Sequence, residues 1–100
     1  MSNVKVIYQR SQVIISIIGH FDSKSLHEFR SCYKELAGGD MKILVDLEQA
    51  VYMDSSAIGM LLAMKDYLGC DYCAIEILNC QPKIMKIFKI TNLGNLFKIT

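Results

Sequence analysis

The stretch that decides the fold of this chain runs Val51-Tyr52-Met53-Asp54-Ser55-Ser56-Ala57-Ile58-Gly59-Met60-Leu61-Leu62. An apolar run over residues 41–47 ends just before it, and an apolar helical pattern begins inside it. Between the two patterns stand one carboxylate and two hydroxyls, the side chains that accept hydrogen bonds from the first amides of a helix. The stretch therefore predicts a buried strand, a polar junction, and a helix from Ser55 or Ser56 to about Leu68 that Gly69 stops.

The segments on either side of this stretch predict a small α/β domain. Alternating and β-branched residues predict strands over 4–8 and 13–18, and helical spacing predicts a helix from Asp22 or Ser23 to about Ala37. Consecutive apolar residues predict a central strand over 42–47 that is buried on both faces. A strand over 73–78, a helix opened by Pro82 and a short final strand over 96–100 follow, with turns at 38–40 and 92–95. We expect one domain over residues 1–100, with helices packed on a mixed β-sheet in the order β-β-α-β-α-β-α-(β).

Composition narrows the classes of function. The chain has 100 residues, of which 52% are hydrophobic and 21% are charged, as in an ordinary globular domain. Its net charge of +1 gives no reason to expect a nucleic acid as partner. No signal-peptide pattern is apparent, and no apolar run reaches the roughly 18–20 residues that a membrane span needs. We therefore expect a cytoplasmic protein without membrane insertion. As a separate expectation, the protein is a monomer or a weak dimer.

The charge is distributed unevenly along the chain. Residues 1–80 carry seven Lys or Arg and ten Asp or Glu, a net −3, whereas residues 81–100 carry four Lys and no acid, a net +4. Lys83, Lys86 and Lys89 are spaced three apart, which places them roughly on one helical face. That face is either simply solvated or part of a docking surface for an acidic partner.

Catalytic and metal-binding patterns are weak. Cys70 and Cys73 have the spacing of a redox or metal half-site, but no second pair or histidine cluster accompanies them, and burial of these thiols is the favoured interpretation. His20 and His27 are not near any Ser or Cys in sequence that would form a nucleophile–base pair. No Gly-rich phosphate loop is present. We expect neither an enzyme nor a bound metal or cofactor.

The polar junction has two interpretations, a helix cap and a switch. One cap needs fewer groups than the carboxylate and two hydroxyls of Asp54, Ser55 and Ser56. Gly59 costs the helix about 1 kcal/mol relative to Ala, which suggests that something approaches it closely. Ala57 also keeps the rim of the junction small. These features favour a junction that a large partner can reach.

The helix after the junction is apolar nearly all round. Ile58, Leu61, Leu62 and Leu68 suffice for a core face, which leaves Met60, Met64 and Tyr67 on another side. That second side either docks a partner, for which methionine is well suited, or belongs to the core.

A phosphate on the first serine would change the surface more than the fold. Its charge would lie at the positive end of the helix dipole, near free amides, so we expect the fold to tolerate it. A partner packed beside it would have to desolvate about two negative charges. Phosphorylation would then act as an on/off switch without internal rearrangement.

The residues from Tyr52 to Leu62 resemble the signature of the STAS domain, in particular that of the bacterial anti-sigma factor antagonists, Asp-Ser-Ser/Thr-Gly-Leu-Gly after a strand. The resemblance covers essentially the whole chain, because the order of elements and the turn Gly19-His20-Phe21-Asp22 also match. Ala57 stands where the family usually has Gly.

The resemblance implies a function by partner switching. In that family the unphosphorylated antagonist binds an anti-sigma factor that is also a serine kinase, phosphorylation of the serine after Asp releases it, and a PP2C-type phosphatase reverses the modification. By position, Ser55 would be the acceptor, with Ser56 the second choice. The resemblance also implies that Asp22, at the facing turn, lies near the same edge of the domain. With the motif and the helix pattern, this gives the expected partner-binding set Asp22, Asp54, Ser55, Ser56, Ala57, Gly59, Met60 and Met64.

Other STAS proteins provide alternatives. A small STAS subunit of a lipid-trafficking ABC transporter has a similar length and would dock on an ATPase without needing a phosphorylatable serine. Scaffold proteins with the same fold usually have longer chains. The intact Asp-Ser-Ser sequence favours the antagonist.

Overall fold

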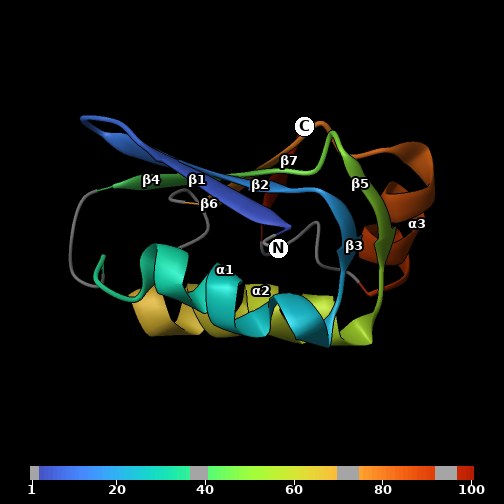
Figure 1. The fold of residues 1–100 in the computed structure, drawn as a ribbon. Coiled ribbons are helices and arrows are strands. Elements are labelled where there is room, and N and C mark those ends of the chain that lie inside the picture. Colours follow the sequence, from blue (N-terminus) through green and yellow to red (C-terminus); the bar gives the residue numbers. More distant parts are fainter. Residues whose placement is uncertain (1–2, 37–40, 70–74, 92–96) are drawn as a thin grey trace.

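A five-stranded sheet lies over a layer of two helices (Figure 1). The computed structural model describes residues 3–36, 41–69, 75–91 and 97–100. The strand order in the sheet is β1-β2-β4-β6-β7. These strands are β1 (Val4–Tyr8), β2 (Gln12–Ile17), β4 (Lys42–Asp46), β6 (Ile75–Leu78) and β7 (Lys98–Ile99).

The sheet is mixed, as the alternation of strands and helices predicts. β1 and β2 form an antiparallel hairpin, whereas β2–β4, β4–β6 and β6–β7 are parallel pairs. In the central strand, Ile43, Leu44 and Val45 are all buried. The predicted α/β fold class and the burial of the central strand are therefore confirmed.

The starts of the helical segments and the end of α2 lie where local sequence signals place them. A 3-10 turn, η1 (Ser23–Ser25), leads into α1 (Leu26–Tyr33). Asp22 caps η1 by accepting a hydrogen bond from the amide of Lys24. α2 (Ser55–Leu68) ends at Gly69, which adopts the left-handed conformation with φ of 63°. α3 (Pro82–Ile90) has its proline in the first turn, where no amide hydrogen is needed. Figure 1 shows α1 and α2 beneath the sheet and α3 at one end of the molecule.

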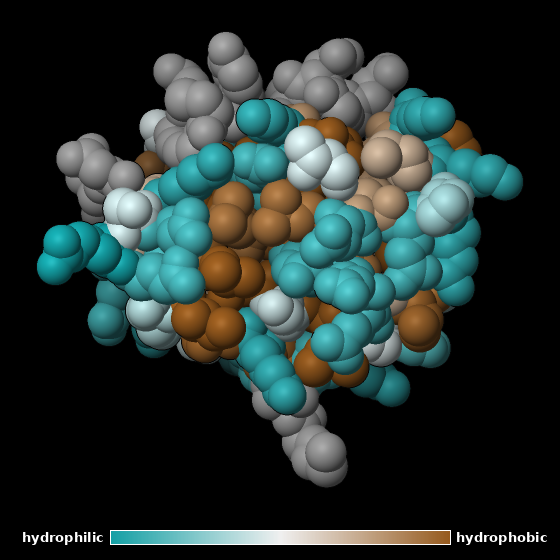
Figure 2. Space-filling model, turned by 90° about the horizontal axis from the view of Figure 1, so that it is seen from above, coloured by the Kyte–Doolittle hydropathy of each residue, from teal (hydrophilic) through white to brown (hydrophobic). Residues whose placement is uncertain are grey.

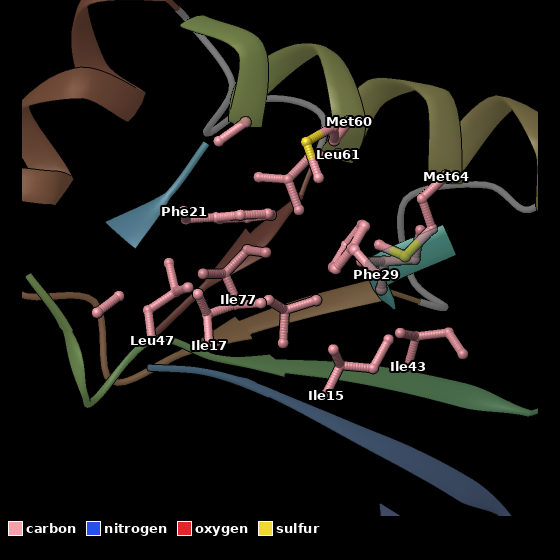
Figure 3. Packing of buried hydrophobic residues seen from close by; sticks show 14 of the residues in the cluster. Ile15, Ile17, Phe21, Phe29, Ile43, Leu47, Met60, Leu61, Met64 and Ile77 are labelled. Atoms are coloured by element: carbon pink, nitrogen blue, oxygen red, sulfur yellow. The ribbon is translucent and has the colours of Figure 1, made fainter. Parts of the chain in front are cut away.

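The core lies between the sheet and the helix pair. Alternate residues of each strand, such as Ile15, Ile17 and Ile43, point toward the helices and are buried (Figure 3). Phe21 and Phe29 meet them from the helix side, with ring centroids 5.2 Å apart. The other face of the sheet carries no described helix.

A second sheet of two short strands was not predicted. β3 (Gly19–Phe21) pairs in parallel with β5 (Ala50–Met53). Gly19 allows this, because its φ of 80° turns the chain out of β2 and into β3. What sequence reasoning took as a turn after β2 and as a junction before α2 is therefore a pair of strands.

Several predicted boundaries differ from the structure or fall outside its described part. α1 ends at Tyr33 instead of near residue 37, with Lys34 as its C-cap. The predicted turns at 38–40 and 92–95, the first two residues of the predicted strand over 73–78, Leu96, and the pair Cys70 and Cys73 lie outside the described residues.

Candidate functional site

Two helical segments start side by side at one edge of the fold. Phe21 of β3 is the parallel partner of Met53 of β5, so Asp22 and Asp54 each follow a paired strand end. Neighbouring strands lie about 4.8 Å apart, which keeps these two positions close. Each aspartate is the N-cap of the helical segment that follows it. The structure thus brings together the two aspartates that the sequence separates by 32 positions.

Asp54 caps α2 through one of its carboxylate oxygens. Its Oδ1 accepts hydrogen bonds from the amides of Ser56 and Ala57, at 3.0 and 3.2 Å, and from the Ser56 hydroxyl at 2.5 Å. The Ser56 hydroxyl bond, followed by the two amide bonds, holds the pKa of the Asp54 carboxyl below its ordinary value. Asp54 therefore carries its negative charge at the start of α2.

The two serines of the junction have different environments. Ser56 is half-buried and its hydroxyl donates to Asp54. Ser55 is exposed in the first position of α2, and its hydroxyl has no hydrogen-bond partner among the described residues. Of the two hydroxyls, Ser55 is the one that an enzyme can reach without breaking an existing bond.

Of the two interpretations of the side of α2 that carries Met60 and Met64, partner docking is wrong and core packing is confirmed. Met60 is 6% exposed and Met64 is fully buried, and both pack into the core with Leu61 (Figure 3). Ala57 is also buried, so it does not form part of an accessible rim. The large apolar side chains that α2 does expose are Leu62 and Tyr67. None of Ala57, Met60 and Met64 is available to a partner in this fold.

The buried face of α2 follows a regular helical spacing that the sequence contained. Positions 57, 60, 61 and 64 are apolar throughout, whereas the alternative stripe through Ile58, Leu61 and Leu62 reaches Lys65 one turn later. A lysine at that position marks the stripe as the less buried one. This charge is the signal that could have identified the correct face.

Gly59 lies on the exposed side of α2. A Cβ atom added there would meet no atom within 4 Å. The packing of the chain itself therefore does not explain the glycine. Its bare backbone is open to whatever approaches α2 near Ser55.

The comparisons with known proteins agree on a family. The family model described as "Mlab, STAS domain" matches residues 5–99. A STAS-domain containing protein of Pseudomonas aeruginosa is 40% identical over 89 residues, which make up 89% of this chain and 88% of the relative. This chain belongs to the STAS-domain family.

Solved structures show the same STAS fold. The anti-sigma factor antagonist SpoIIAA in its unphosphorylated form is similar with a TM-score of 0.78 at 23% identity, over 97% of this chain and 87% of SpoIIAA. A STAS-domain protein from Planctomyces limnophilus reaches 0.83 at 16% identity, over 100% and 90% of the two chains. An anti-sigma factor antagonist from Mycobacterium paratuberculosis reaches 0.79 at 14% identity, over 96% and 82%. At these identities the likeness concerns the fold.

The STAS domain has further polar residues near the two helix starts that sequence reasoning did not include. His20 of β3 lies against Tyr52 of β5, with ring centroids 5.0 Å apart, and Tyr52 is exposed. A hollow of about 350 Å³ beside them is lined by Asn3, His20, Asp22, Lys24, Ser25 and Glu28. The hollow brings residues of β3, η1 and α1 together with Asn3, and no motif in the sequence indicated that they meet.

The described part of this STAS domain contains no cluster of three or more metal-ligating side chains. It also contains no helix that is both long enough and apolar enough to cross a bilayer. Cys32 is buried and Cys80 half-buried, both as free thiols. Burial, followed by the charge of Glu28, raises the pKa of the Cys32 thiol to about 11.

Proposed function

We propose that this STAS domain is an anti-sigma factor antagonist that works by partner switching. In its unphosphorylated form it binds an anti-sigma factor or serine kinase of that type, phosphorylation of Ser55 releases the partner, and a PP2C-type phosphatase restores binding. The observation that carries the proposal is the exposed hydroxyl of Ser55, which has no hydrogen-bond partner among the described residues, beside the hydrogen-bonded Asp54–Ser56 pair. SpoIIAA, which shares the fold, has been solved in an unphosphorylated and a phosphorylated form.

The hydrogen bonds at the junction favour Ser55 over Ser56 as acceptor. A phosphate on Ser56 would replace the hydroxyl proton that Asp54 accepts and would bring two negative groups together. A phosphate on Ser55 breaks no bond of the described structure. Because Asp54 already accepts the amides of Ser56 and Ala57, that phosphate finds fewer free amides than the sequence suggested. It therefore points outward and alters the surface.

The proposed partner surface surrounds Ser55 and replaces the predicted methionine face. It comprises the capping residues Asp22 and Asp54, the serines Ser55 and Ser56, Gly59, and the exposed Tyr52 and Leu62. A phosphate adds about −1.5 to −2 charges to this surface at neutral pH. A partner whose apolar side chains cover Leu62 would have to desolvate them, which weakens the complex.

The first prediction separates phosphorylation from packing at this surface. Ser55→Asp should weaken binding of the partner kinase at least about tenfold, a free-energy change of about 1.4 kcal/mol, whereas Ser55→Ala should bind as the wild type does. Each variant serves as bait in a lysate of the native host, and mass spectrometry identifies and quantifies any captured serine kinase of the anti-sigma type. Phosphopeptide mapping of the wild type from the same host should locate the phosphate on Ser55.

The control for this experiment is the neighbouring serine. Ser56→Ala also removes one serine hydroxyl but leaves the hydroxyl of Ser55 in place, so this variant should still be phosphorylated on Ser55. A phosphate found on Ser56 or elsewhere, or equal kinase binding by Ser55→Asp and Ser55→Ala, would contradict the proposal. Equal binding of an ABC-transporter ATPase by both variants would support the transporter-subunit alternative, which the description of the matching family leaves open.

A further inference from the structure

The outer face of the five-stranded sheet carries no described helix. Both α1 and α2 lie on the opposite face (Figure 1). In β2 the buried residues Val13, Ile15 and Ile17 point toward the helices, so Ile14 and Ser16 point outward. The strand registers then show which outward side chains of neighbouring strands lie next to each other.

One outward row is apolar across three strands. Ile7 of β1 is the partner of Ile14, and Ile14 is the partner of Leu44 in β4. Ile7 is 54% exposed and Ile14 is half-buried, whereas Leu44 is only 8% exposed. Figure 2, which looks onto this side from above, shows a hydrophobic patch bordered by hydrophilic residues.

The next outward row carries one charge of each sign. Lys5 of β1 is the partner of Ser16, and Ser16 is the partner of Asp46 in β4. Two strand spacings separate the charged positions by about 10 Å. Lys5 is exposed and forms no ion pair within the described residues. Asp46 accepts from the Asn79 side chain and the Glu48 amide through Oδ1 alone.

This arrangement is complementary to itself. A half-turn about an axis that lies along β2, in the plane of contact, exchanges the positions of β1 and β4 between two copies. Ile7 then lies over the position of Leu44 in the second copy, Ile14 faces Ile14, and Lys5 faces Asp46. Because Leu44 is only 8% exposed, Ile7 and Ile14 supply the apolar contact. Each contact occurs twice except the central one, as a two-fold interface requires. The strands of the two sheets remain roughly aligned, as in stacked sheets.

We propose that the outer face of β1, β2 and β4 is a self-association surface that binds a second copy of this chain. Outside the two rows described above, the outward face is occupied by its own charges. Lys42 at the start of β4 and Glu76 of β6 form an ion pair of 3.0 Å that Thr100 and Lys98 flank. The contact is therefore confined to three strands of about five residues, a footprint of roughly 250 Å². Stable interfaces bury about 800 Å² per partner, so the dimer is weak, with a Kd of roughly 10 µM to 1 mM.

Sedimentation equilibrium of the intact chain between about 5 µM and about 1 mM tests the surface. The wild type should shift from monomer to dimer over this range. The double variant Ile7→Thr/Ile14→Thr keeps β-branched side chains and should weaken the dimer at least about tenfold, with an unchanged circular dichroism spectrum. Leu26→Thr, which changes an exposed apolar residue of α1 in the helix layer, should leave association unchanged. A wild type that stays monomeric, or a Leu26 effect equal to that of the sheet variant, would overturn the proposal.

A mixing experiment tests the predicted pairing of charges between copies. Lys5→Asp alone and Asp46→Lys alone should each dimerise less than the wild type, because each places like charges opposite one another twice. An equimolar mixture of the two variants makes both contacts attractive and should restore the dimer. In both mixtures Asp46→Lys carries a fluorescent label, and only its own association is followed. Lys83→Asp, which changes a lysine on α3, should not restore that association, because its Lys5 still lies opposite the lysine introduced at position 46. Equal association of the labelled protein in the two mixtures would show that net charge, and not this register, is responsible.

Discussion

Of the three adjacent residues Asp54, Ser55 and Ser56, two form the cap of α2 and one does not. Asp54 and Ser56 are bonded to each other and to the first amides of α2, so they fix the helix start. Ser55 is exposed and is not needed for that cap. The sequence indicated that the junction had one hydroxyl more than a cap requires, but only the hydrogen bonds show which hydroxyl is the spare one.

Burial of individual side chains in α2 could be predicted only in part. Leu61 was correctly predicted to lie in the core. Leu62 was predicted to be buried but is exposed, whereas Met60 and Met64, which were assigned to a partner surface, are buried. A helix with apolar residues on nearly every side has no unique buried face by periodicity alone, because the sheet above decides which stripe it covers. Lys65 was the one local indication.

The second prediction tests this exchange. Met64→Ala removes a fully buried side chain and should lower the free energy of unfolding by about 2–5 kcal/mol. Leu62→Ala removes a side chain that is 37% exposed and should change it by no more than about 0.5 kcal/mol. Urea unfolding followed by circular dichroism measures both. Equal losses for the two variants would show that both faces of α2 are packed.

At the scale of elements, the sequence predicted those that local signals define and missed those that pairing defines. The β1–β2 hairpin, β4, α2 with its glycine stop, and α3 with its proline start were all anticipated. β3 and β5 have only three and four residues, too few for a recognisable alternation, and their parallel pairing joins segments 31 positions apart at Gly19 and Ala50. The site depends on this missed pair, because it sets Asp22 beside Asp54.

The third prediction compares alanine substitutions at Gly59 inside α2 and at Gly69, its C-cap. Gly59 is helical and has open space where the methyl group of an alanine would lie, so Gly59→Ala should stabilise the fold by about 0.5–1 kcal/mol. Gly69 has equally open space but a φ of 63°, so Gly69→Ala should destabilise it by about 1 kcal/mol. Thermal unfolding measures the two signs. A loss of stability in Gly59→Ala would contradict the exposed position assigned to this residue.

At the scale of the whole molecule, two carboxylates couple stability to pH. The Ser56 hydroxyl and then the amides of Ala57 and Ser56 lower the pKa of Asp54. The hydrogen bond from Lys42, followed by the charges of Lys42 and Lys98, lowers the pKa of Glu76 on the outer sheet face. These groups lie in different layers, at the start of α2 and in β6.

The fourth prediction follows from the direction of these shifts. A carboxyl whose folded pKa is lowered contributes stability fully above its unfolded pKa, which is about 3.9 for Asp and 4.3 for Glu, and loses that contribution as pH falls through the lower folded value. Wild-type stability should therefore decline below about pH 4.3 through these two groups. The double variant Asp54→Asn/Glu76→Gln should be less stable at neutral pH and should show a shallower acid decline in urea midpoints. Parallel declines in both proteins would contradict the assignment.

The two short strands also determine how much order a partner must impose. The chain leaves the large sheet twice at this edge, from β2 into β3 and from β4 toward β5, and the two segments are hydrogen-bonded where they do so, with the Gly19 amide donating to the Gln49 carbonyl at 2.9 Å. Ser55 therefore follows a hydrogen-bonded strand and not a free loop. Under the proposed function, binding at this edge would lose little conformational entropy, so even a partner with a small contact area would gain usable affinity there, and the charge of a single phosphate on Ser55 would be enough to cancel it.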